Sequence, residues 1–124
     1  MTSLKSDTDT FISGIFADID AKNAEGFASR LSENARMRIG SQDPIFGPAA
    51  VVEGLSGFFQ MIKALQHETV EVWEDGDTLI VESEVTYTRL DDSQITVPAV
   101  SILRRGPERI DDYRIFIDLG PVFA

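Results

Sequence analysis

The sequence predicts a mixed α+β fold in which a curved, cone-shaped antiparallel sheet wraps around helices that cover one of its faces. Two patterns lead to this prediction. In the first half of the chain, apolar residues recur every three or four positions, as on one face of a helix; in the second half, apolar and polar residues alternate, as in strands. Helices followed by a run of strands are typical of α+β domains.

Two helices are expected at the start of the chain. The first spans about residues 7–20, where Ser6 to Asp9 offer several N-cap side chains. Its apolar stripe consists of Phe11, Ile12, Ile15, Phe16 and Ile19. The second helix is expected to begin after Asn23, another N-cap candidate, and to continue through Leu31.

A short strand, a loop and a third helix follow. Residues alternate from Ala35 to Ile39, and the next stretch, 40–48, contains two glycines and two prolines. The third helix is predicted over about residues 49–65, with a bulky apolar stripe. Gly54 and Gly57 lie within it and weaken the helix, but they allow another backbone to approach closely.

Four long strands are predicted in the rest of the chain. They span residues 68–74, 78–89, 95–105 and 109–119. Each boundary carries turn residues: Asp75-Gly76, Asp91-Asp92-Ser93 and Gly106-Pro107. Because these turns are short, consecutive strands are expected to pair antiparallel.

Composition limits the classes of protein to consider. The chain has 124 residues, 43% hydrophobic and 26% charged, which predicts a single domain over residues 1–124. It has no cysteine, so disulfides and thiolate metal sites are excluded. A formal net charge of -10 repels nucleic acid. No apolar run approaches the about 20 residues of a membrane span, and the first ten residues lack the centre of a signal peptide. We therefore expect a cytoplasmic protein without nucleic-acid or membrane partners.

Four stretches of the sequence resemble one known superfamily. They are IDAKNAEGFASRLSENARMRIG, LQHETVEVWEDGDTLIVESEVTYTR, ITVPAVSILRR and IDDYRIFIDL. Together with the predicted element order, they are similar to the nuclear transport factor 2-like superfamily, in its SnoaL-like and ketosteroid isomerase-like branch. The resemblance implies a cystatin-like α+β roll that leaves an internal pocket. It implies no single reaction, because members include isomerases, epoxide hydrolases, polyketide cyclases and proteins without known activity.

The resemblance also implies positions for acid and base groups, which this chain fills with other side chains. Steroid isomerases need a carboxylate base and two hydrogen-bond donors. The matching positions here are Ile15, Ile39, and Ala99 or Ser101. In the epoxide hydrolases and cyclases of the superfamily, the acid and base residues lie at other positions. The resemblance matches those positions to Val85, Tyr87 and Ile115 of this chain. The usual acid and base residues are therefore expected to be missing.

Strand alternation nevertheless predicts a pocket. The face of the long strand that carries Val85 and Tyr87 should point inward, and so should the face of the last strand that carries Tyr113. Tyr87 and Tyr113 would be the hydrogen-bond donors of an otherwise apolar site; alternatively, their hydroxyls satisfy one another or the backbone in a filled interior. The predicted apolar wall consists of Phe16, Phe58, Phe59, Ile62, Val85, Ile115 and Ile117.

His67 is the only histidine and the candidate for proton transfer, because imidazole can act as a base near neutral pH. The alternative is a surface or capping role at the start of a strand. One histidine with scattered carboxylates makes no metal-ligand pattern, so we expect neither a metal nor a cofactor.

Two functions from different classes remain open. The chain could bind a small apolar, oxygen-bearing molecule and act as an isomerase, cyclase or hydrolase. Alternatively, it could be a non-catalytic binding or accessory protein of the same fold. In either case we expect a homodimer through the outer face of the sheet, because some of the side chains that point to this face are apolar. They are Ile80, Val100, Ile102 and Phe116.

Overall fold

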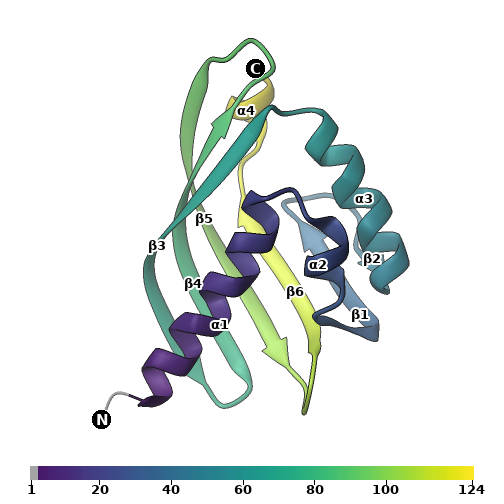
Figure 1. Ribbon diagram of the computed structural model, residues 1–124, viewed down its shortest axis with the longest axis vertical. Helices are drawn as coiled ribbons and strands as arrows, with labels where there is room; N and C mark the ends of the chain where they lie inside the picture. Colours follow the sequence, from purple (N-terminus) through teal and green to yellow (C-terminus); the bar gives the residue numbers. More distant parts are fainter. Residues whose placement is uncertain (1–2) are drawn as a thin grey trace.

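The computed structural model describes residues 3–124, which form four helices and six strands (Figure 1). The helices are α1 (Ser3–Asp20), α2 (Ala24–Ala28), α3 (Pro48–Gln60) and α4 (Gly120–Phe123). The strands are β1 (Leu31–Ile39), β2 (Ile45–Phe46), β3 (Ala64–Asp75), β4 (Thr78–Thr88), β5 (Gln94–Arg105) and β6 (Ile110–Ile117). The predicted α+β class is confirmed. Residues 1 and 2, which begin the stretch considered for a signal peptide, lie outside the described residues.

All six strands form one curved, unclosed sheet in the order β2-β1-β6-β5-β4-β3. From β3 to β6, consecutive strands pair antiparallel, as the turns predicted. In contrast, β1 pairs parallel with β6, a long-range contact that no local pattern in the sequence indicates. β3 is an edge strand with a β-bulge, because Thr69 pairs with Ser83 and Glu71 with Glu82, which leaves Val70 unpaired.

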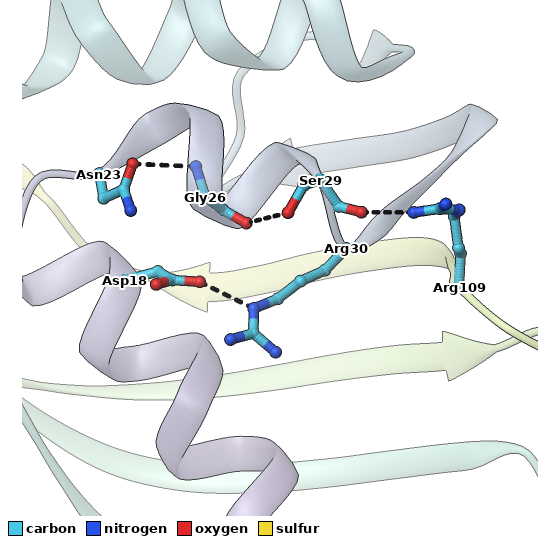
Figure 2. Close-up of polar contacts among 6 residues, drawn as sticks. All are labelled: Asp18, Asn23, Gly26, Ser29, Arg30 and Arg109. Carbon is cyan, nitrogen blue, oxygen red and sulfur yellow. Dashed lines mark hydrogen bonds and ion pairs between the residues drawn. The ribbon is translucent and has the colours of Figure 1, made fainter.

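Helix α1 begins at Ser3, earlier than predicted, so the expected N-cap residues lie inside it. Thr8 donates a hydrogen bond from Oγ1 to Glu74 Oε1 on β3 at 2.8 Å. Most of the predicted apolar stripe is buried, namely Ile12, Ile15, Phe16 and Ile19. Near the end of the helix, Asp18 accepts a hydrogen bond from Arg30 Nε at 2.8 Å (Figure 2). This ion pair fixes α1 to the segment that leads into β1.

Helix α2 is shorter than predicted. Its N-cap is Asn23, as expected, and Asn23 Oδ1 accepts a hydrogen bond from the Gly26 N–H at 2.9 Å (Figure 2). Ser29 Oγ then donates to the Gly26 carbonyl at 2.7 Å, while the Ser29 carbonyl accepts from Arg109 Nη1 at 2.6 Å. Because these side chains satisfy the carbonyl groups, the helix ends before Ser29, and Leu31 begins β1 instead of closing the helix.

Helix α3 also ends earlier than predicted. It begins at Pro48, directly after Gly47, whose φ of 87° favours glycine. It ends at Gln60, and β3 begins at Ala64 within the stretch expected to be helical. Leu65 is nevertheless buried, because its strand faces the same core as the helix.

The hydrophobic core lies between the helices and the face of the sheet that they cover (Figure 1). On β4 the buried and half-buried residues alternate strictly, so the predicted inner face is correct. Its buried residues are Leu79, Val81, Ser83, Val85 and Tyr87. Within residues 3–124, none of the helices combines the length and the apolar character of a membrane-spanning segment.

Candidate functional site

An internal cavity of about 40 Å³ lies between the sheet and the helices α1 and α3. A water molecule needs about 10–15 Å³ of such space, so the cavity has room for a few waters. Its polar lining comes from His67, Ser83, Tyr87, Ser101 and Tyr113. The other lining residues are Ile19, Met37, Ile39, Leu55, Phe58, Phe59, Leu65, Val85, Ala99, Ile115 and Ile117. It is an apolar site with a few polar groups, the composition typical of small-molecule pockets.

One wall of the cavity contains an aspartate–histidine pair. His67 Nδ1 lies 2.6 Å from Asp20 Oδ1, and the His67 backbone N–H donates to Asp20 Oδ2 at 2.9 Å. The carboxylate therefore holds both the ring and the backbone of His67. The histidine side chain is only 11% exposed, and the aspartate 24%. Among the described hydrogen bonds, Nδ1 is the ring nitrogen of His67 that has a partner, and His67 lines the cavity.

The sequence of α1 explains how this pair is positioned. Asp20 is the last residue of α1, and Phe16 lies one turn earlier on the same side of the helix. The Phe16 ring stacks on the imidazole of His67, with ring centroids 4.2 Å apart and an interplanar angle of 17°. A carboxylate at the carboxyl end of a helix is disfavoured by the helix dipole. The two contacts with His67 compensate for this unfavourable position.

The bulge in β3 decides which way His67 faces. Between the bulge and the start of the strand, His67 pairs with Val85 and Leu65 pairs with Tyr87, so both lie on the inner face. Before the bulge the odd-numbered residues of β3 face inward, and after it the even-numbered residues do, as the pairing of Val72 with Val81 shows.

Two tyrosines contribute hydroxyl groups to the cavity. Burial raises the pKa of Tyr87 to about 12, and the negative charge of Asp20 adds to this effect. Burial also raises the pKa of Tyr113, while the Ser101 side chain partly opposes the shift. Both residues are therefore neutral hydrogen-bond donors over the physiological range. The ring of Tyr113 contacts Phe27 edge-on, with centroids 5.2 Å apart, which fixes its orientation.

Ser83 is a polar group without a partner. It is 1% exposed, lies on the inner face of β4, and lines the cavity. Its Oγ has no hydrogen-bond partner among the described residues. Because a buried hydroxyl normally has a partner, the Ser83 hydroxyl is available to a polar atom of a molecule in the cavity.

The structure brings together most of the residues expected in the pocket. His67, Tyr87 and Tyr113 line the cavity, and so do five members of the predicted apolar wall, namely Phe58, Phe59, Val85, Ile115 and Ile117. Phe16 lies outside the lining, because it packs behind the imidazole. Ile62 also lies outside it, because it follows α3 and is buried in the core, where its carbonyl accepts from Lys22 Nζ at 2.8 Å.

The positions matched to the family's acid and base residues are mostly on the cavity wall. Ile39, Ala99, Ser101 and Ile115 all line it, and Ile15 is buried outside it. The residue that sequence reasoning missed is Asp20, which matches none of those positions. The signal available was its place at the end of the apolar stripe of α1, one turn after Phe16.

The arrangement is suited to moving a proton. An imidazole held at Nδ1 by a carboxylate can accept a proton at Nε2, and neutral tyrosines can donate hydrogen bonds to an oxygen that gains negative charge. Within the described part of the chain, no three His, Cys, Asp or Glu side chains are grouped as metal ligands would be.

The curved sheet, the covering helices and the internal pocket place the protein in the class of nuclear transport factor 2-like α+β proteins. More specifically, the chain belongs to the SnoaL-like domain family, which it matches over residues 12–113. No curated protein matches it in sequence.

Solved structures have the same fold at low sequence identity. A hypothetical protein with a ketosteroid isomerase-like fold from Catenulispora acidiphila, solved with trimethylamine, has a TM-score of 0.81 at 14% identity, over 87% of this chain and 85% of that one. TerC, co-crystallised with polyporic acid, has a TM-score of 0.79 at 17% identity, over 90% of this chain and 92% of that one. A protein from Jannaschia sp. CCS1, provisionally described as a SnoaL-like polyketide cyclase, has a TM-score of 0.78 at 15% identity, over 90% of this chain and 85% of that one.

Proposed function

We propose that the protein binds a small, apolar, oxygen-bearing molecule and catalyses a proton transfer on it, with His67 as the base. The observation that carries this proposal is the 2.6 Å contact between Asp20 and His67 Nδ1 at the wall of the cavity. Asp20 is a positioning residue, because it touches His67 and not the cavity. The names of two structural neighbours, a polyketide cyclase and a protein crystallised with polyporic acid, support an oxygen-bearing cyclic ligand.

The proposed step is the removal of a proton from a carbon next to a carbonyl group. The C–H bond breaks, the proton binds His67 Nε2, and the electron pair moves to the carbonyl oxygen, which becomes an enolate. Tyr87 or Tyr113 donates a hydrogen bond to this oxygen. Return of the proton to another position of the ligand completes an isomerisation. In a cyclisation, the enolate carbon attacks a second carbonyl group, and the proton on His67 Nε2 passes to the new alkoxide oxygen.

The size of the cavity favours a second candidate, a non-catalytic binding or accessory protein. At about 40 Å³ the space holds waters, and a cyclic ligand can enter only if side chains of the wall move. Phe58 is one of the half-buried wall residues, so its ring has room to move.

Hydrogen exchange in D₂O distinguishes the two candidates. We expect the protein to accelerate exchange of the α-protons of small cyclic ketones such as cyclohexanone, followed by NMR. His67→Ala should reduce the rate at least about 100-fold, the usual contribution of a general base. Asp20→Asn should lower kcat while KM is unchanged, because it alters the orientation of the imidazole and not the ligand's contacts. Unfolding temperatures show whether each variant remains folded.

Glu68→Gln is the matched control, because Glu68 is the exposed neighbour of His67 on the other face of β3. It removes one carboxylate, as Asp20→Asn does, and should leave the rate unchanged. If the wild-type protein gives no acceleration while the ketones bind, the non-catalytic candidate is supported. If His67→Ala is as active as the wild type, His67 is not the base.

We also propose that the protein forms a homodimer through the outer face of the sheet. The centre of this face is apolar and partly exposed: Phe116 pairs with Val100, and Phe116 is 51% exposed. Carboxylates lie on the β3–β4 side of this centre, at Glu68, Glu82 and Glu84. Arginines lie on the β1–β6 side, at Arg36, Arg38 and Arg114. A two-fold axis through the centre brings the acidic side of one copy onto the basic side of the other.

Light scattering at tens of micromolar protein tests the dimer. We expect the mass of two chains for the wild type and of one chain for Phe116→Glu. Leu90→Glu is the control, because Leu90 is 67% exposed but lies in the turn after β4, away from this face. A monomeric wild type would refute the proposal.

A further inference from the structure

A second hollow, which we call the outer groove, lies beside the candidate site. It has a volume of about 410 Å³ and is formed by β1, β2, α3 and α4, on the side of the molecule where α3 covers β1 (Figure 1). Met37, Ile39, Leu55 and Phe58 line both the outer groove and the inner cavity. Only a layer of side chains therefore separates the two spaces, with no strand or helix between them.

Two glycines of α3 keep the outer groove open. Gly54 and Gly57 both line it, and neither has the positive φ that would require glycine. A Cβ on Gly54 would approach Ile45 Cδ1 to 3.2 Å, whereas a Cβ on Gly57 would meet nothing within 4 Å. Glycine is a poorer helix former than alanine. Gly57 thus weakens the helix without any need from packing or conformation, and its effect is to leave space in the groove.

The lining of the groove fits an apolar, uncharged group. Met61 is 54% exposed and Phe123 is 45% exposed, and both border it. Large apolar side chains gathered around a concave surface are typical of a binding site. Asp43 and Glu53 are the charged residues of the lining, so the groove repels a carboxylate or phosphate.

Phe58 lies between the two spaces. Its ring lies edge-on to the ring of Tyr87 on the inner side and to the ring of Phe123 on the outer side. In both pairs the ring centroids are 6.1 Å apart. The segment that carries Phe123 is held in turn by Arg89, which donates from Nε to the Val122 carbonyl at 2.9 Å and from Nη2 to the Pro121 carbonyl at 2.6 Å. Phe58 is therefore one of the four side chains in the layer that separates the inner cavity from the outer groove.

We propose that the ligand is an elongated molecule with an oxygen-bearing head and an uncharged apolar arm. The head enters the inner cavity beside His67 and Tyr87, and the arm lies in the outer groove along Gly54 and Gly57. This inference rests on the proposed function, because it assigns the chemical class of the ligand for the same site. Joining the two spaces also removes the size limit that the inner cavity alone imposes.

Calorimetric titration with phenol and 4-alkylphenols of increasing chain length tests the proposal. Each methylene group buried in the outer groove should tighten binding by about threefold to fourfold until the groove is filled. Gly57→Phe places a ring in the groove and should abolish this dependence on chain length, while phenol itself binds as before. Gln60→Phe is the matched control: it places the same ring at an exposed position of α3 outside the lining of both spaces, so it should bind the whole series like the wild type. Gly57→Leu should give an intermediate loss and serves if Gly57→Phe does not fold.

The outcomes separate this inference from the proposed function. If phenol binds and His67→Ala weakens it, but chain length has no effect, the outer groove takes no arm and only this inference fails. If the gain per methylene persists in Gly57→Phe, the arm lies elsewhere and the inference is wrong. If neither phenol nor any alkylphenol binds, both proposals are refuted.

Discussion

The two walls of the inner cavity differ in chemistry although both belong to one sheet. The wall formed by β3 and β4 carries His67, Ser83 and Tyr87, with Asp20 behind the histidine. The wall formed by β1 and β6 carries Met37, the isoleucines at 39, 115 and 117, and one polar residue, Tyr113. Two of the family's acid and base positions, Ile39 and Ile115, fall on this second wall, where this chain has hydrocarbon. Most of the polar groups of this chain lie instead on the first wall, near the end of α1.

This difference shows that a site without the family's usual acid and base residues can still have polar groups at other positions. Apart from Tyr113, the wall of β1 and β6 is built for packing, so substitutions there should affect stability. The wall of β3 and β4 is built around polar groups, so its substitutions should affect binding and proton transfer more than folding. Three measurements test this division.

The largest effect on stability is expected at Met37. It is 1% exposed, so Met37→Ala removes buried volume and should lower the free energy of unfolding by about 2–4 kcal/mol, measured by urea denaturation. Glu33→Ala, at an exposed position of the same strand, is the control and should change it by less than about 0.5 kcal/mol. A loss at Met37 no larger than at Glu33 would show that this wall is loosely packed.

Alkaline pH should reveal the burial of Tyr87. Its pKa rises to about 12 on folding from an ordinary value of 10.0, so the unfolded chain loses its proton first as the pH increases. The contribution of the neutral Tyr87 hydroxyl to the free energy of unfolding is complete below pH 10. It disappears as the pH rises through 12, a loss of about 3 kcal/mol. In Tyr87→Phe, the fall in stability between pH 10 and 12 should be smaller than in the wild type, as measured by denaturation at fixed pH values. Equal falls in both proteins would place the hydroxyl in contact with solvent.

The smallest effect on stability is expected at Ser83. Because its hydroxyl has no partner among the described residues, Ser83→Ala should change the free energy of unfolding by less than about 1 kcal/mol. The same variant should weaken binding of phenol if the hydroxyl contacts the ligand. Ser56→Ala, on α3 away from the cavity lining, should leave binding unchanged. A large loss of stability in Ser83→Ala would mean that a buried water depends on this hydroxyl.

The fold was predictable because its signals are local. The alternation on β4, the Asp75-Gly76 turn and the Asn23 N-cap each lie within a few residues, and the structure confirms all three. The element ends at Leu31 and Ala64 were wrong, because there a strand pairing overrides a sequence that is also compatible with a helix. The parallel pairing of β1 with β6 joins distant segments and has no local signal.

The candidate site was predictable only in part, for the same reason. His67 was singled out as the only histidine, and Tyr87 followed from strand parity. Asp20 was missed, because its link to His67 spans 47 positions and depends on where α1 crosses β3. The outer groove was also missed, although the two glycines of α3 stand out in the sequence. Their spacing predicted a close backbone contact, whereas Gly57 faces open space.

Val70, the unpaired residue of β3, sets the register between the hairpin turn and the histidine. If Val70 paired with Ser83 in an uninterrupted ladder from the Asp75-Gly76 turn, each earlier residue of β3 would move one position along β4, and His67 would lie opposite Thr86 on the outer face. The imidazole would then point away from the cavity although no residue of the site had been substituted. Loss of Val70 would instead keep His67 opposite Val85, so the extra residue is compatible with the site only as a bulge.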